Sequence, residues 1–133
     1  MHTDDLFDFI DLKKNKITFI IHLGAITDTT EKNIELLEKY NLSYSKCVWE
    51  KCVNYSIPLI YASSAATYGN GNMGFSDDHQ KVNLFKSLNF YAKSKHDFDK
   101  YVLAEKNTPP FWFALKFFNV FGFDESKKGK MSS

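Results

Sequence analysis

The stretch Ile17-Thr-Phe-Ile-Ile-His-Leu23, closed by Gly24-Ala25, decides the fold class of this chain. It is a short, nearly continuous apolar run in which β-branched residues are frequent. Such a run predicts a buried strand of a parallel sheet with a tight exit at the glycine. Two further apolar runs, at residues 59–63 and 111–118, predict two more strands of the same kind.

Helical segments precede each of these predicted strands. Residues 5–14 indicate the end of an amphipathic helix, and residues 33–55 and 90–106 carry two longer helical patterns. Asp28 lies three residues before Glu31, which is the spacing of a helix-start capping pair with Asp as the cap. A repeated helix–strand order implies parallel strands joined by right-handed crossovers, the α/β doubly wound class.

Length and composition limit the possible classes of protein. The chain has 133 residues, enough for one domain with a core, and a net charge of +1, which does not suggest a nucleic-acid or membrane-surface partner. No apolar run approaches the roughly 20 residues that span a bilayer, and the first residues do not resemble a signal peptide. Cys47 and Cys52 lie five apart on a predicted helix, so we expect two reduced thiols and no metal site.

Tyr91 and Lys95 lie four residues apart in the third predicted helix, so their side chains share one face. A free phenol has a pKa of about 10, and a lysine cation beside it favours the phenolate. Ser64, reaching the same substrate oxygen, would complete a set that removes a proton from an alcohol while hydride leaves the carbon. The alternatives are a surface helix pair for Tyr91 and Lys95, and a capping role for Ser64.

Candidate residues follow all three predicted strands. They are Gly24-Ala25-Ile26 after the first strand, Ser63-Ser64 after the second and Asn119-Val120 after the third. Ligands of doubly wound sheets bind outside the carboxyl ends of the strands. The three exits therefore predict one shared site.

Three motifs carry a resemblance to a known family: Tyr61-Ala-Ser-Ser-Ala-Ala-Thr-Tyr-Gly69, Tyr91-Ala-Lys-Ser-Lys95 and Phe118-Asn-Val-Phe-Gly122. With them the chain, from about Lys16 onward, resembles the extended short-chain dehydrogenase/reductase family, which includes NAD-dependent nucleotide-sugar epimerases and dehydratases. The resemblance implies a cytoplasmic, homo-oligomeric isomerase with a tightly held NADP. It also implies that C6 of ADP-glycero-manno-heptose, a precursor of the lipopolysaccharide core, is inverted by transient oxidation and re-reduction.

The resemblance also implies a role for individual residues. Tyr91 would be one acid/base and Lys128 a second, Lys95 would hold the nicotinamide ribose, and Ser64 would bind the reacting oxygen. The implied cofactor-binding residues are Gly24, Ala25, Ile26, Asn41, Tyr91, Lys95 and Val120, and the implied substrate-binding residues are Ser64, Asn119 and Lys130. No metal site is implied.

Some of these roles have plain alternatives. Asn41 fits an ordinary helix position equally well, and Lys128 lies in a lysine-rich tail that is typical of solvated charge. Phe123 and Lys127 depart from the proline and histidine that the family usually has there, and Lys130 stands where serine is common. His22 ends an apolar run and is expected to be a hydrogen-bonded core histidine.

Residues 1–16 contain no Gly-x-x-Gly-x-x-Gly turn, and we expect the substrate domain of such an enzyme to lie outside residues 1–133. We therefore expect residues 1–133 to form one partial Rossmann-like NAD(P)-binding domain, with residues 123–133 at the start of a substrate-binding region. Such a piece should expose apolar faces and be inactive alone. The alternatives are a relative such as a UDP-hexose 4-epimerase, or a non-catalytic Rossmann-like interaction piece; residues 65–67 argue against a dehydratase.

Overall fold

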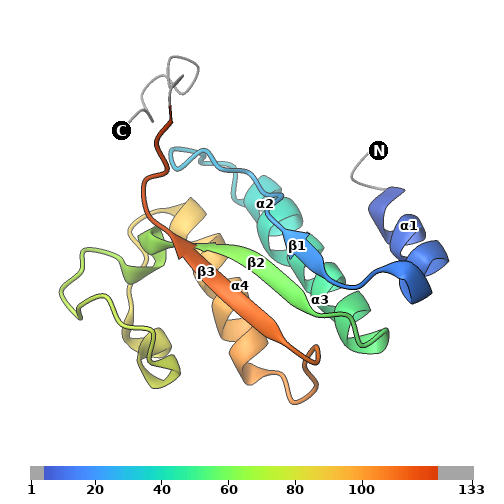
Figure 1. The fold of residues 1–133 in the computed structure, drawn as a ribbon. Coiled ribbons are helices and arrows are strands. Elements are labelled where there is room, and N and C mark those ends of the chain that lie inside the picture. The colour runs from blue at the N-terminus through green and yellow to red at the C-terminus, as the bar shows by residue number, and fades with distance from the viewer. Residues whose placement is uncertain (1–4, 123–133) are drawn as a thin grey trace.

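A computed structural model describes residues 5–122 of the chain. Its centre is a three-stranded parallel sheet in the order β1-β2-β3, formed by Ile20–His22, Leu59–Ser64 and Trp112–Phe117 (Figure 1). In the register, Ile21 lies beside Ile60, and Ile60 lies beside Phe113. All three strands therefore end at the same edge of the sheet.

A helix or helical stretch precedes each strand. α1 spans Asp5–Lys13, and the segment between β1 and β2 is one long helical stretch made of α2 (Ile34–Leu37), η2 (Glu38–Ser43) and α3 (Tyr44–Asn54). α4 spans Phe90–Ala104 and connects to β3. Short 3-10 turns complete the described chain: η1 (Lys14–Lys16), η3 (Ala65–Tyr68) and η4 (His79–Leu84).

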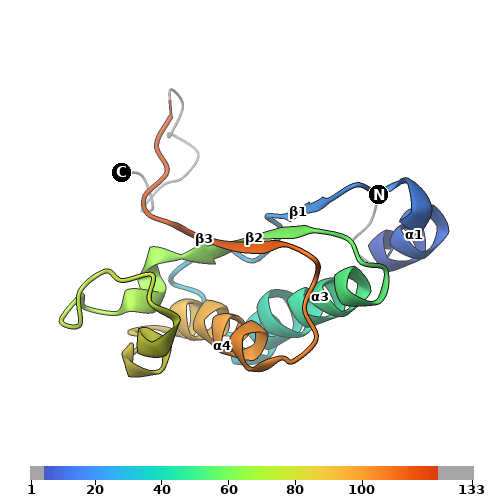
Figure 2. The same ribbon diagram turned by 60° about the horizontal axis from the view of Figure 1, so that its bottom comes forward.

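The core lies between one face of the sheet and the helices. Figure 2 shows α3 and α4 on the same side of the sheet. Trp49 of α3 packs edge-on against Trp112 of β3, with ring centroids 5.4 Å apart, and Tyr61 of β2 packs against Phe98 of α4 at 4.8 Å. The core cluster consists of Ile10, Val48, Trp49, Cys52, Ile57, Leu59, Tyr61, Phe98 and Val102. Burial of these side chains is the main stabilising contribution.

The opposite face of the sheet is not covered by any of residues 5–122. Phe113 is 60% exposed, and Ile21, on the other side of Ile60, is 52% exposed. We call this surface the open face; its residues alternate along the strands and are Ile21, Ile60, Ala62, Phe113, Leu115 and Phe117. The prediction of strands buried on both sides is therefore wrong for this part of the chain, whereas the expected exposure of apolar faces is confirmed.

The predicted α/β class with parallel strands is confirmed, and all three helix predictions hold with shifted ends. The predicted helix cap at Asp28 is wrong. Asn33 caps α2 by accepting a hydrogen bond from the Leu36 amide at 3.0 Å, because it directly precedes the helix. Asp28 instead accepts hydrogen bonds from the amide and hydroxyl of Thr30, at 2.8 and 2.7 Å.

No sequence pattern predicted η2, which is a π-helical segment within the predicted continuous helix. Single π-helical turns inside α-helices often occur at functional sites. This one contains Asn41, whose side chain is fully buried. No helix among residues 5–122 is both long and apolar enough to cross a membrane.

Candidate active site

Tyr91 and Lys95 lie at the start of α4, where the helix packs against β2 and η3. The helix begins here because the Asn89 side chain accepts a hydrogen bond from the Ala92 amide at 2.7 Å. Both side chains are buried, Tyr91 with 8% and Lys95 with 6% of its surface exposed. The surface-pair alternative is therefore wrong, because neither side chain lies on the solvent face of the helix.

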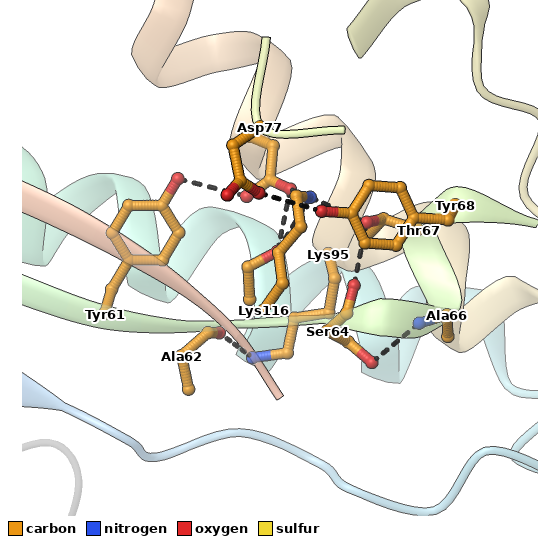
Figure 3. Close-up of polar contacts among 11 residues, drawn as sticks. Tyr61, Ala62, Ser64, Ala66, Thr67, Tyr68, Asp77, Lys95 and Lys116 are labelled. Atoms are coloured by element: carbon orange, nitrogen blue, oxygen red, sulfur yellow. Dashed lines mark hydrogen bonds and ion pairs between the residues drawn. The ribbon is translucent and has the colours of Figure 1, made fainter. Parts of the chain in front are cut away.

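The Lys95 ammonium group reaches the end of β2. Its Nζ donates a hydrogen bond to the carbonyl oxygen of Ala62 at 2.9 Å, beside Ser64 (Figure 3). Burial lowers the pKa of Lys95 to about 8, and the charge of Asp99 partly opposes this shift. A lysine with this pKa gives up its proton more readily than a surface lysine.

Ser64 is the last residue of β2 and the cap of η3. Its Oγ accepts a hydrogen bond from the Ala66 amide at 3.2 Å, so the capping alternative describes a real interaction. Capping uses the hydroxyl as an acceptor only, and no acceptor for its own proton is found among residues 5–122. The hydroxyl can therefore cap the turn and still donate to a bound oxygen.

Asn41 ties the loop after β1 to α4. Its Oδ1 accepts from the Ile26 amide at 2.8 Å, and its Nδ2 donates to the Ile26 carbonyl at 3.1 Å and to Ser94 Oγ at 3.1 Å. Ser94 Oγ in turn donates to the carbonyl oxygen of Tyr91 at 2.8 Å. Asn41 thus connects the first strand exit to the turn that carries Tyr91, and its contact with a cofactor stays a prediction.

The other predicted residues lie at the strand exits or beyond the described chain. Gly24 and Ala25 follow β1 after Leu23, and a Cβ added at Gly24 would meet nothing nearer than 4.0 Å. Asn119 and Val120 follow β3 and are exposed. Lys128 and Lys130 lie outside the described residues, and their roles stay predictions.

A buried polar network, which the sequence did not predict, lies beside Lys95. Asp99 accepts hydrogen bonds from Tyr61 Oη at 3.0 Å and Ser63 Oγ at 2.7 Å, and it forms an ion pair with Lys116 at 2.6 Å. Lys116 also donates to Thr67 Oγ1 at 2.7 Å (Figure 3). The spacing could have indicated Asp99 as a residue of the site, because it lies four residues after Lys95 and eight after Tyr91, on the same face of α4.

The network joins the elements that carry the candidate residues. Asp99 comes from α4, Lys116 from β3 and Thr67 from η3. The ion pair is nearly inaccessible, with side-chain exposures of 14% for Lys116 and 4% for Asp99. Buried charge pairs of this kind hold elements in a defined register when every group has a partner.

Two plainer predictions are confirmed. His22 is a buried histidine whose Nε2 lies 2.9 Å from Ser45 Oγ, and burial together with the charge of Lys95 lowers its pKa to about 4. Cys47 and Cys52 are free thiols. Within residues 5–122 no group of His, Cys, Asp or Glu side chains is arranged to hold a metal ion.

The parallel sheet with polar residues at its strand exits is that of a doubly wound α/β protein. Residues 2–133 match the NAD dependent epimerase/dehydratase family, and the chain belongs to this family. This confirms the family predicted from the three sequence motifs.

Two of the curated relatives have the same name. ADP-L-glycero-D-manno-heptose-6-epimerase of Fusobacterium nucleatum is 43% identical over 134 residues, which cover 98% of this chain and 40% of the relative. The protein of the same name from Nitratidesulfovibrio vulgaris is 40% identical over 136 residues, covering 100% of this chain and 42% of the relative. The chain thus spans about two fifths of the length of the curated relatives it matches.

Solved structures also match the fold of this chain. The crystal structure of Helicobacter pylori ADP-L-glycero-D-manno-heptose-6-epimerase matches with a TM-score of 0.79 at 30% identity, covering 100% of this chain and 41% of that chain. MoeE5 in complex with UDP-glucose and NAD matches with a TM-score of 0.72 at 23% identity, covering 92% and 41%. The second similarity concerns the fold alone.

Proposed function

We propose that this chain is the part of a nucleotide-sugar epimerase that carries the acid/base residues, acting on ADP-glycero-manno-heptose. The observation that carries the proposal is the burial of Tyr91 and Lys95 together at the start of α4, beside the strand end that bears Ser64. The names of the relatives support the choice of sugar nucleotide. The NAD dependent epimerase/dehydratase family supports a nicotinamide cofactor, and NADP is our proposal for it.

The residues would act as a set. Ser64 would donate a hydrogen bond to the oxygen on the reacting carbon, and Tyr91 would accept the proton from that oxygen. Lys95 would bind the ribose of the cofactor and favour the ionised form of the tyrosine. The nicotinamide, when bound, supplies the acceptor and later the donor of the hydride.

The strand exits fit a bound nucleotide. The atom nearest to a Cβ added at Gly24 is His22 Cε1 at 4.0 Å, so a ligand can approach the backbone there. Ala25, Ile26 and Val120 would line the same cofactor, and Asn41 would contact its nicotinamide end. Asn119 and Lys130 would contact the sugar nucleotide, and Lys128 would be the second acid/base.

The domain assignment is part of the proposal. Residues 1–133 would form a single partial NAD(P)-binding unit, and residues 123–133 would begin the substrate-binding region. Because the chain spans about two fifths of its relatives, the complete activity is proposed for a longer protein and not for this chain alone.

A chimera tests the assignment. Residues 1–133 would replace the matching segment of the Fusobacterium nucleatum relative, with which they share 43% identity. The chimera should epimerise ADP-glycero-manno-heptose, and Tyr91→Phe should lower kcat by at least about 100-fold. Tyr101→Phe, on the same helix, is the matched control and should change kcat little. A folded, active chimera that is insensitive to Tyr91→Phe would contradict the role of Tyr91.

The same chimera separates two kinds of epimerase. Lys128→Ala should abolish C6 inversion but spare a 4-epimerase, which does not need a second base. A chimera that is inactive on ADP-glycero-manno-heptose but inverts a UDP-hexose would support the 4-epimerase instead. The chain by itself should not convert either substrate.

A further inference from the structure

A cavity separate from the candidate active site lies on the other side of α4. It has a volume of about 720 Å³ and is lined by residues 29–32, residues 85–90 and four residues of α4. Ser64, Tyr91 and Lys95 are not among its lining residues. Lys93 and Lys100, seven residues apart, share the side of α4 that faces the cavity and is turned away from Lys95.

Two buried polar groups in the wall of this cavity have no partner among the described residues. Both ring nitrogens of His96 and the Oγ of Ser87 are inaccessible to solvent and make no hydrogen bond. His96 as a whole is 3% exposed. Buried polar groups are nearly always hydrogen-bonded, and the few exceptions point to a missing partner.

The charge of the cavity is positive. Four lysines line it, Lys32, Lys86, Lys93 and Lys100, against the two acids Glu31 and Asp97. Asp97 is already paired with Lys93. Glu31 accepts hydrogen bonds from the amides of Lys32 and Asn33, at 2.8 and 2.7 Å. Lys32, Lys86 and Lys100 have no ion pair within residues 5–122.

Part of the remaining wall is apolar. Phe85, Leu88 and Phe90 lie on the segment that leads into α4. The volume is within the range of small-molecule sites, about 300–1,000 Å³, and larger than a lone inorganic anion needs. A ligand that fills it would combine an apolar ring with an anionic group.

We propose that this cavity binds a small molecule with an anionic group on an apolar ring, such as a phosphate monoester. Lys86 and Lys100 contact the anionic group, and Phe85 and Phe90 pack against the ring. The ring of His96, whose nitrogens are covered in the unliganded chain, turns toward the cavity and donates a hydrogen bond to the anionic group. The site is independent of the proposed epimerase activity, because it shares none of the residues assigned to that reaction.

Equilibrium dialysis tests the proposal with phenyl phosphate as the probe. The whole chain would be fused to a solubility carrier, and the carrier alone would be measured beside it. We expect a dissociation constant below about 1 mM for phenyl phosphate. Inorganic phosphate and benzyl alcohol, which each carry half of the ligand chemistry, should bind at least about tenfold more weakly. Equal retention of phenyl phosphate by the carrier alone would overturn the proposal.

Matched variants locate the site. Lys86→Ala with Lys100→Ala should weaken binding about tenfold, whereas Lys81→Ala with Lys106→Ala, outside the cavity, removes the same charge and should leave binding unchanged. Equal weakening by both pairs would mean non-specific attraction and would overturn the site. His96→Phe should weaken binding about threefold, and unchanged binding would overturn the assignment of His96.

Discussion

The two faces of the sheet differ in the side chains they carry and in what covers them. The face toward α3 and α4 carries His22, Tyr61, Ser63 and Lys116, each of which has a hydrogen-bond partner. The open face carries Phe113 and other apolar side chains that no described residue covers. Polar groups are therefore buried where they have partners, while much of the apolar surface remains in contact with solvent.

The two faces contribute in different ways: the covered face positions the candidate site, and the open face can contribute only to the stability of the sheet. The covered face has the ion pair and the hydrogen bonds that fix α4 against β2 and β3. The open face has only apolar area to contribute, and apolar area is non-directional. Parallel sheets normally have both faces covered, so further polypeptide against the open face would add stability without changing the polar network.

The largest effect is expected from breaking the buried ion pair on the covered face. Asp99→Ala leaves the Lys116 ammonium buried without its carboxylate and should lower the free energy of unfolding by about 3–5 kcal/mol. Urea unfolding measures this change in free energy. Asp97→Ala removes a half-exposed acid of the same helix and should cost about 0.5 kcal/mol.

The double variant Asp99→Leu with Lys116→Met removes both charges and should recover most of the loss. A cost below about 1 kcal/mol for Asp99→Ala would show that the pair does not hold the covered face together.

A smaller, pH-dependent effect is expected from His22. Its pKa is lowered from the usual 6.5 to about 4 in the folded chain, mainly by burial. Below pH 6.5 the unfolded chain takes up a proton that the folded chain does not, so stability falls as the pH is lowered toward 4. At pH 5 this amounts to about 2 kcal/mol relative to pH 7.

Urea unfolding at pH 7 and pH 5 measures the loss, and His22→Gln should remove this part of the pH dependence. His79→Gln, which removes an exposed histidine, is the control and should leave the dependence in place. An unchanged pH dependence in His22→Gln would mean that other groups cause it.

The smallest effect on stability, but a visible one on solubility, is expected on the open face. Phe113→Thr with Leu115→Thr places β-branched side chains in β3 and should change the free energy of unfolding by less than about 1 kcal/mol. The soluble fraction after centrifugation should rise several-fold, because exposed apolar patches promote association.

Leu12→Gln with Leu84→Gln removes two exposed leucines from outside the sheet and is the control. Equal gains in solubility from both pairs would mean that the open face is not the cause of association.

The sequence predicted most of the fold because its signals are local. Apolar runs marked the strands and apolar spacing marked the helices, and neither depends on distant contacts. The ends of elements were less accurate: Asn33 and Asp28 are both good caps, and only the folded path of the chain decides between them. The π-helical segment depends on the long-range hydrogen bonds of Asn41 and could not be inferred from its neighbours in sequence.

The sequence predicted individual residues of the candidate site, but it did not predict the buried contacts between Asp99 and Lys116 beside them. Tyr91, Lys95 and Ser64 belong to motifs with fixed spacing. Asp99 and Lys116 have ordinary charged identities that usually indicate a solvent-exposed position, and their pairing joins residues 17 positions apart. A buried charge is recognised only when its partner is known.

The Asn41 side chain has a consequence for the motions of the chain. One amide group holds the Ile26 loop, the π-helical segment and the first turn of α4, so none of the three can open without breaking its hydrogen bonds. Segments linked in this way exchange their amide hydrogens as one cooperative unit. The protection of the Ile26 amide would then report the opening of the turn that holds Tyr91, although the two residues are 65 positions apart in the sequence.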